Sequence, residues 1–301
     1  MRLKLNEVRN WNFVAGMYAK TLQESDDANG YLLGGSVSSL DAKFENTSLA
    51  AYLAADRMIT PKTTFVFNSR LERSDLDYAG LTDIDRTTLR FNVSDWLWGG
   101  NISLINKLTI TNSIYFTLSR GYLTGGINQH PKLVAINRPY EPEHMINIEI
   151  GHKWLTSEFS IQTSLFYSLR SDQQVSLSTQ QDPEDPNSFF FYRANAAKGK
   201  NSGIEVESNY SFSPSLRAHL SLALLDSYVN SFEYSGPNGV ELSGDRESAH
   251  APQYRTHFGI EWSSYLGFFA KVAGTHTSDF YFSESHNESS DAYSLVDGSF
   301  G

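Results

Sequence analysis

The chain has 301 residues, a formal net charge of -10 and no cysteine; 40% of its residues are hydrophobic, 13% aromatic and 19% charged. The acidic balance, with no basic stripe, argues against non-specific nucleic-acid binding, and the missing cysteines exclude disulfides and thiolate chemistry. No apolar run approaches the roughly 18 residues of a membrane helix, so the protein either avoids membranes or crosses one as a closed barrel. Low charge with many aromatic residues favours an all-β protein, and a mean hydropathy of -0.37 is compatible with barrel strands.

Alternating apolar and polar residues predict about thirteen strands, most of them paired across very short turns. In the first half of the chain, the predicted hairpins are 3–8 with 11–23, 47–58 with 63–78, and 97–108 with 114–122. Long polar connections are expected over 25–42 and from 79 through 95, because apolar alternation is lost there.

The second half of the chain repeats this arrangement. Its predicted hairpins are 146–154 with 159–177, 189–212 with 216–229, and 254–262 with 268–280, followed by a last strand at 293–300. We expect an irregularity near 199–203, an acidic loop at 180–187, and a loop rich in Gly, Pro and Ser that runs to Pro252.

Short turns on one side and long loops on the other predict an antiparallel transmembrane β-barrel with periplasmic turns and extracellular loops. Aromatic residues flank the short turns, where an interfacial girdle would need them. They are Trp154, Phe212 and Trp262 before a turn, and Phe159, Tyr265 and Phe268 after one. The alternative is a soluble β-sandwich, in which the same rings would cap a core.

No catalytic constellation emerges from the sequence. None of the eight histidines has metal-ligand spacing with another. Asp172, Glu184 and Asp185 lie in or beside the acidic loop, where solvated charge is the usual explanation. Residues 121–126 lack the spacing and the lysine of a phosphate-binding loop. We therefore predict neither an enzyme nor a bound cofactor.

One stretch carries a recognisable order of short motifs. It reads Ser119-Arg120-Gly121-Tyr122, Gly125-Gly126-Ile127-Asn128, Tyr140-Glu141-Pro142-Glu143 and Asn147-Ile148-Glu149-Ile150-Gly151-His152-Lys153. Further along come Asp172-Gln173-Gln174, Asn195-Ala196-Ala197, Gly203-Ile204-Glu205-Val206-Glu207 and Ala251-Pro252. This order, over about 130 residues, resembles the barrel of TonB-dependent outer-membrane receptors of the siderophore-receptor type.

The resemblance implies a receptor in the outer membrane of a Gram-negative cell that takes up a scarce ligand, with energy supplied by the TonB system through a plug domain. A ferric siderophore is the expected ligand and outer-membrane lipid the surroundings. The expected ligand contacts, in the outer loops, are Gln129, His130, Arg138, Tyr140 and Tyr192. The residues expected to line the lumen and face the plug are Arg120, Glu149, Lys153, Glu205 and Glu207.

The family pattern includes a signal peptide, a TonB-binding box, a plug domain and about 22 strands. We recognise only the barrel, so residues 1–301 are expected to be one partial barrel domain that transports nothing alone. Two other functions stay open: an outer-membrane barrel enzyme of the protease or phospholipase type, and a soluble all-β binding module.

Overall fold

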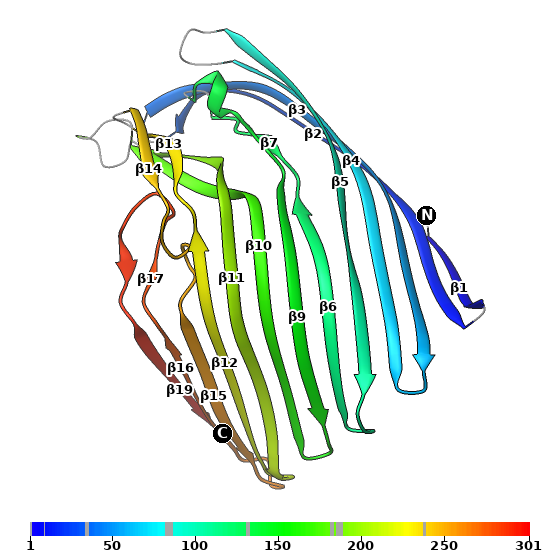
Figure 1. Ribbon diagram of the computed structural model, residues 1–301. Coiled ribbons are helices and arrows are strands. Elements are labelled where there is room, and N and C mark those ends of the chain that lie inside the picture. Colours follow the sequence, from blue (N-terminus) through cyan, green and yellow to red (C-terminus); the bar gives the residue numbers. More distant parts are fainter. Residues whose placement is uncertain are drawn as a thin grey trace.

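The computed structural model describes residues 2–8, 10–33, 36–81, 87–130, 133–180, 184, 189–236 and 239–301. Thirteen strands form one antiparallel sheet in the order β1-β2-β3-β4-β5-β6-β9-β10-β11-β12-β15-β16-β19. Figure 1 shows that this sheet is strongly curved, with β1 and β19 at its two edges. The predicted all-β antiparallel fold and the predicted number of strands are therefore confirmed.

The strands of this sheet have the following bounds: β1 Arg2–Val8, β2 Trp11–Leu33, β3 Ser36–Thr60, β4 Thr63–Leu81, β5 Thr88–Lys107, β6 Asn112–Leu123, β9 Glu143–Leu155, β10 Phe159–Gln180, β11 Phe189–Ser213, β12 Leu216–Val229, β15 Tyr254–Ser263, β16 Phe269–Thr277 and β19 Tyr293–Phe300. Three small hairpins lie in the long connections: β7 Gly126–Ile127 with β8 Pro139–Tyr140, β13 Phe232–Gly236 with β14 Gly239–Ser243, and β17 Phe280–Tyr281 with β18 Ser289–Ser290. A 3-10 helix, η1, covers Ala135–Asn137.

Hydroxyl side chains close several of the short turns. The Thr156 Oγ1 accepts a hydrogen bond from the amide of Phe159 at 2.9 Å, and the Ser264 Oγ accepts one from the amide of Phe268 at 3.1 Å. The Thr60 Oγ1 does the same for the amide of Thr63 at 3.0 Å. Such local bonds satisfy the backbone of a tight turn without further chain, so the hairpins stay short at this end.

The register gives the sheet one apolar and one polar face. Direct cross-strand partners form the row Phe116–Ile150–Leu165–Ile204–Leu224, whose side chains are partly or largely exposed. The neighbouring row on the other face is Tyr115–Gly151–Ser164–Glu205–Ala223. A folded protein that exposes a continuous apolar surface of this kind normally covers it with lipid or protein.

Aromatic side chains form a ladder at the short-turn end of the apolar face. Trp154 contacts Phe159 with ring centroids 5.4 Å apart, Phe159 contacts Tyr210 at 6.1 Å, and Tyr210 contacts Phe212 at 4.6 Å. Three of these four rings are among those expected to flank the turns.

Two sequence expectations about β2 to β5 were wrong. Residues 25–42 are not a loop, because β2 continues to Leu33 and β3 begins at Ser36; β5 likewise begins at Thr88, within the expected connection. The register explains why these strand extensions were missed. The row Leu49–Arg73–Trp96 still carries two large apolar side chains on its face of the sheet. The next rows on the same face are Thr47–Asp75–Ser94 and Glu45–Asp77–Asn92, so the extensions are polar there and lack the alternation that marks a half-buried strand.

The irregularity expected near 199–203 was also misplaced. The register between β10 and β11 runs unbroken through these residues. The distortion lies at Asp172 of β10, which has φ 53 and is skipped between the pairs Ser171–Lys198 and Gln173–Ala196. Most of the predicted acidic loop, residues 181–183 and 185–187, lies outside the described residues.

Candidate functional site

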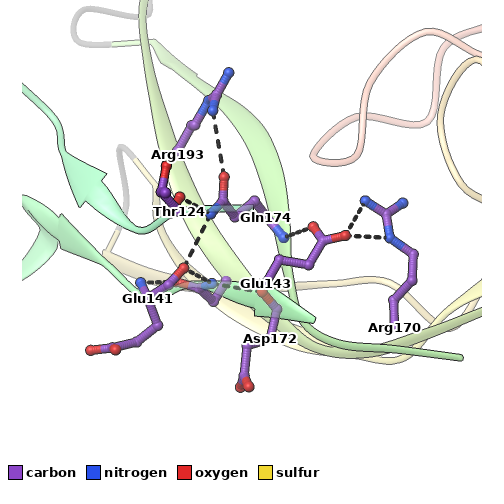
Figure 2. A network of polar contacts seen from close by, with 8 residues as sticks. Thr124, Glu141, Glu143, Arg170, Asp172, Gln174 and Arg193 are labelled. Carbon is purple, nitrogen blue, oxygen red and sulfur yellow. Dashed lines mark hydrogen bonds and ion pairs between the residues drawn. The ribbon is translucent and has the colours of Figure 1, made fainter. Parts of the chain in front are cut away.

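The candidate site is the polar junction at which the β6–β9 connection, residues 124–142, meets β10 and β11. Figure 2 shows this junction around Glu143 and Gln174. The Glu143 side chain is buried, and the Arg170 Nε donates to its Oε1 at 2.7 Å while the backbone amide of Gln174 donates to its Oε2 at 2.8 Å. Both carboxylate oxygens therefore have charge-assisted or backbone partners, as a buried charge requires.

Two amide side chains hold the backbone of the connection. The Gln174 Nε2 donates to the carbonyls of Thr124 at 2.8 Å and Glu141 at 3.2 Å. The Asn195 Oδ1 accepts from the amide of Glu141 at 2.8 Å, and its Nδ2 donates to the Glu141 carbonyl at 3.0 Å and to the Asp172 carbonyl at 2.7 Å. These contacts give the Asp172-Gln173-Gln174 and Asn195 motifs a structural role: they fasten the connection to two strands.

Asn128 makes a similar reciprocal pair further along the connection. Its Nδ2 donates to the Arg193 carbonyl at 2.7 Å, and its Oδ1 accepts from the Arg193 amide at 2.7 Å. The side chain of Asn128 thus replaces the neighbouring strand that the β11 backbone lacks at this point. A second segment of the connection is thereby fixed to the sheet.

The other side of the connection is fastened to β4. Arg138 is fully buried, and its Nε donates to the Leu133 carbonyl at 3.1 Å while its Nη1 donates to the Tyr78 hydroxyl at 3.2 Å. Ile127 packs with Leu76 and Tyr78. Because Leu76 and Tyr78 share a face with the polar-face residue Glu72, the connection lies on the polar-face side of the sheet and bridges β4 to β10 and β11.

A second apolar cluster packs Leu133 of the β6–β9 connection against residues of β10, β11, β12 and β13. Its members are Leu133, Val175, Leu177, Tyr192, Val229, Phe232 and Tyr234. The Tyr234 hydroxyl donates to Glu241 at 2.8 Å, and burial together with this carboxylate raises the pKa of Tyr234 to about 12. This hydroxyl therefore stays protonated at physiological pH.

The five expected ligand contacts are not equivalent in the structure. Arg138 is fully buried, so it supports the fold of the connection and is not open to a ligand here. Tyr192 is 5% exposed and packs in an apolar cluster, but it also lines a pocket of about 280 Å³. Gln129 and His130 are half-buried residues of the connection, and Tyr140 pairs with Gly126 in the small β7–β8 hairpin. These three and Tyr192 remain candidates.

Sequence reasoning missed a pocket of about 800 Å³ on β2 to β5, to which the described part of residues 124–142 contributes no lining side chain. The middle cross-strand row of its lining is Phe44–Tyr78–Phe91, with the rings of Tyr78 and Phe91 6.3 Å apart, and the rows on either side are mostly polar or charged, with Asp77 and Arg90 among them. Phe44 and Phe91 lie close to or within segments that were interpreted as polar loops, so their shared position could not be seen. A pocket of this volume can hold a medium-sized ligand.

Four of the five expected lumen residues share the polar face. Glu149, Lys153, Glu205 and Glu207 lie in adjacent rows of β9 and β11, joined through Phe166, Gln162 and Ser164 of β10. Tyr115 of the same face donates its hydroxyl to Glu149 at 2.6 Å. The register places these four side chains on one face; that they line a lumen and contact a plug remains a prediction.

Arg120 is on the opposite face, which corrects the expectation. Arg120 pairs with Ile146, two residues along from the pair Leu118–Ile148, and therefore lies on the same apolar face as that pair. Its guanidinium lies 4.1 Å from the centroid of the Trp98 ring and donates to the Trp98 carbonyl. The expectation rested on face parity, but Arg120 lies two residues from Leu118 and therefore shares the apolar side of β6.

Tyr122, the aromatic residue of the same motif, has its contacts on the polar face. Its hydroxyl donates to Glu72 at 2.8 Å and accepts from the Arg70 Nε at 3.1 Å. Pairing between β5 and β6 ends at Gly100 and Arg120, so Tyr122 is no longer bound to β5 and can reach this face.

Within the described ranges, no group of three or more His, Asp or Glu side chains is arranged to hold a metal ion. No helix in the described part of the chain has the length and apolarity that a membrane crossing requires.

A family model described as TonB dependent receptor-like, beta-barrel matches residues 2–301. The pesticin receptors of Yersinia enterocolitica and Yersinia pestis are 27% identical to the chain over 115 residues, which make up 38% of this chain and 16% of each receptor. The chain thus matches a small part of these curated relatives.

Several solved structures share the fold. The ferric yersiniabactin uptake receptor FyuA from Yersinia pestis aligns with a TM-score of 0.80 and 20% identity, over 100% of this chain and 45% of that protein. The siderophore receptor PiuA from Acinetobacter baumannii aligns with a TM-score of 0.71 and 17% identity, over 98% of this chain and 47% of that one. The ferric-catecholate import receptor Fiu from E. coli K12 aligns with a TM-score of 0.72 and 12% identity, over 99% of this chain and 46% of that protein. The chain therefore spans just under half the length of each solved protein.

Proposed function

Because the chain belongs to the TonB-dependent receptor β-barrel family, we propose that it forms part of the wall of an outer-membrane receptor that takes up a ferric siderophore with energy from TonB. The observation that carries this proposal is the two-faced sheet, whose short turns lie at one end and whose long connections lie at the other (Figure 1). This is the arrangement of an outer-membrane barrel. The family is one of receptors and transporters, which speaks against an enzyme.

The apolar face of β5 covers most of the height that a bilayer needs. Eight residue steps separate Leu104 from Trp96 on this face, or about 26 Å along the strand at the usual rise. Because barrel strands are tilted by about 35–45°, this length covers about 20 Å of an apolar band that is about 25 Å tall. Beyond Trp96 the face becomes polar, and at the other end the aromatic ladder from Trp154 to Phe212 precedes the turns. We place the two membrane boundaries at these aromatic residues.

We assign the polar face to the lumen and propose that it contacts the plug domain through which TonB acts. Glu149, Lys153, Glu205 and Glu207 offer charged groups of both signs on this face. Carboxylates and ammonium groups can remain ionised there because a receptor lumen is wet or filled by polar protein.

We place ligand contact at the long-connection end, beside the pocket lined by Phe44, Tyr78 and Phe91. Gln129, His130, Tyr140 and Tyr192 are the candidates, and Arg138 holds the connection in place. The pocket combines an aromatic row with polar and charged neighbours, so it offers both apolar and polar contacts to a ligand. The likeness to FyuA makes ferric yersiniabactin the first compound to test.

Growth on a defined iron source tests the proposal. A strain without the gene, kept in iron-chelated medium, should lose growth on one ferric siderophore and regain it when the complete gene is restored. The same rescue should disappear in a strain that lacks TonB. A deletion strain that takes up every supplied ferric siderophore at the parental rate would overturn the proposal.

A further inference from the structure

Two histidines meet on the polar face, away from the junction described above. His219 lies on β12 and His257 on β15, and they are diagonal neighbours because His219 pairs with Gly259 while His257 pairs with Ser221. Their Nε2 atoms are 3.0 Å apart, and their rings stack with centroids 4.9 Å apart. A separation this short between two imidazole nitrogens requires one bridging proton, because two lone pairs or two N–H groups would repel each other.

A metal ion can take the place of that proton. Imidazole nitrogens bind first-row divalent ions at about 2.0–2.1 Å, so two adjacent ligands of one ion lie about 2.9–3.4 Å apart. The observed 3.0 Å lies in that range. Both nitrogens can therefore bind one ion after a small rotation of the rings.

A third side chain orients one of the two rings. The His257 Nδ1 is 2.9 Å from the Thr275 Oγ1 on β16, the direct cross-strand partner of His257. A hydrogen bond on the inner ring nitrogen leaves the outer nitrogen to face the site, as is typical of histidines that bind metals. The ring of His219 is held from the other side, because it covers the Cα of Gly259 where any larger residue would overlap it.

From this geometry we propose that His219 and His257 bind one borderline divalent cation, of the class Cu²⁺, Ni²⁺ or Zn²⁺, which imidazole prefers over harder ions. No third histidine or carboxylate completes the site among the residues described. The remaining coordination positions therefore belong to water or to an exchangeable small ligand. The site is independent of the proposed siderophore uptake, since it lies on β12 and β15 and shares no residue with the pocket.

Titration of the purified full-length protein with Cu²⁺ in detergent micelles, followed by electron paramagnetic resonance, tests this proposal. We expect one ion per chain with a signal from two nitrogen ligands. His219→Gln and His257→Gln should abolish that signal, and Thr275→Val should weaken binding by about 10–100-fold, the usual effect of losing a residue that orients a ligand. His276→Ala is the matched control: it removes an imidazole from β16 on the opposite face, where it bonds to Ser294 and Tyr254, and should leave binding unchanged.

Glutamine keeps an amide that can hydrogen-bond to the remaining histidine, so these variants should fold, and circular dichroism checks that they do. A folded His219→Gln variant that retains the two-nitrogen signal would overturn the proposal, as would a parent protein that shows no such signal. In either case the two rings are a hydrogen-bonded pair and no more.

Discussion

The ring of Tyr115 lies directly over Gly151, its cross-strand partner on β9. From there its hydroxyl reaches Glu149 at 2.6 Å, and the Lys153 Nζ lies 5.7 Å from the ring centroid. One aromatic side chain thus explains the Glu-x-Gly-x-Lys spacing: the glycine makes room for the ring, the glutamate accepts a hydrogen bond from its hydroxyl, and the lysine contacts its π-face. This motif, one of those that carry the resemblance to the family, is therefore a packing unit of the sheet.

Gly151→Ala should destabilise the barrel, because the added methyl group overlaps the Tyr115 ring. Inserting a methyl into a packed site costs about 1–3 kcal/mol. Denaturant unfolding in micelles measures the loss. Gly298→Ala is the control, since the nearest atom to its added methyl group is the Lys271 carbonyl oxygen at 3.8 Å. Equal losses in the two variants would contradict the argument, whereas the double variant Tyr115→Ala/Gly151→Ala should recover part of the stability.

Glu143→Ala should release the β6–β9 connection. The substitution leaves the Arg170 guanidinium and the Gln174 amide without their partner in a site where Glu143 is 4% exposed. Breaking a buried ion pair on one side costs about 3–5 kcal/mol. Limited proteolysis should then cut within residues 124–142, which the parent protein protects.

Glu261→Ala serves as the control for that experiment. It removes an exposed ion pair with Lys271, at 3.0 Å, which water screens and which therefore contributes little to stability. Cleavage of the connection at the parental rate in the Glu143→Ala variant would show that the amide contacts of Gln174 and Asn195 suffice to hold it.

The extent to which the sequence predicted this molecule depends on where apolar and polar residues alternate. The hairpins through Ile150, Leu165 and Leu224 were predicted correctly, because one side of each strand is apolar. The extensions of β2 to β5 beyond the row of Trp96 were missed, because a strand with polar residues on both faces has no alternation of apolar and polar residues. The left-handed Asp172 has no local signal, and the pocket of Phe44, Tyr78 and Phe91 depends on partners that only the register brings together.

Glu149 and Arg120 lie on opposite faces of the sheet, so their substitution should have different effects on ligand uptake. If the polar face lines the lumen, the double variant Glu149→Leu/Glu205→Leu should insert into the membrane but lose ligand uptake. Arg120→Leu should preserve uptake, because Arg120 lies beside Trp98 at the edge of the apolar face, where a cation destabilises the barrel by only about 0–1 kcal/mol and its removal changes little. Radiolabelled iron uptake measures both, with the amount of inserted protein as the reference. Normal uptake by the Glu149→Leu/Glu205→Leu variant would exclude these acids from the plug contact.

Glu284, in the connection between β17 and β18, should make the stability of this connection depend on pH. Its Oε1 accepts from the Ala249 amide at 2.9 Å, but its Oε2 is buried with no hydrogen-bond partner among the described residues. Burial therefore raises the pKa of the Glu284 carboxyl above its ordinary value.

An acid whose pKa is raised on folding stabilises the protein fully below its unfolded pKa, about 4.3 for Glu. That contribution is lost as the pH rises through the folded value. Glu284→Gln keeps the oxygen that accepts from Ala249 but cannot ionise, so the variant should gain stability relative to the parent as the pH rises from about 4 to 8.

Thermal unfolding at several pH values measures this difference directly. Glu288→Gln is the matched control, because Glu288 is an exposed acid of the same connection and should show no such trend. A Glu284→Gln variant whose melting temperature differs from the parent by a constant amount at every pH would show that Glu284 does not change its ionisation on folding. In that case the carboxylate would have to be solvated or paired, and its burial in this connection would not carry the cost that its unpartnered oxygen implies.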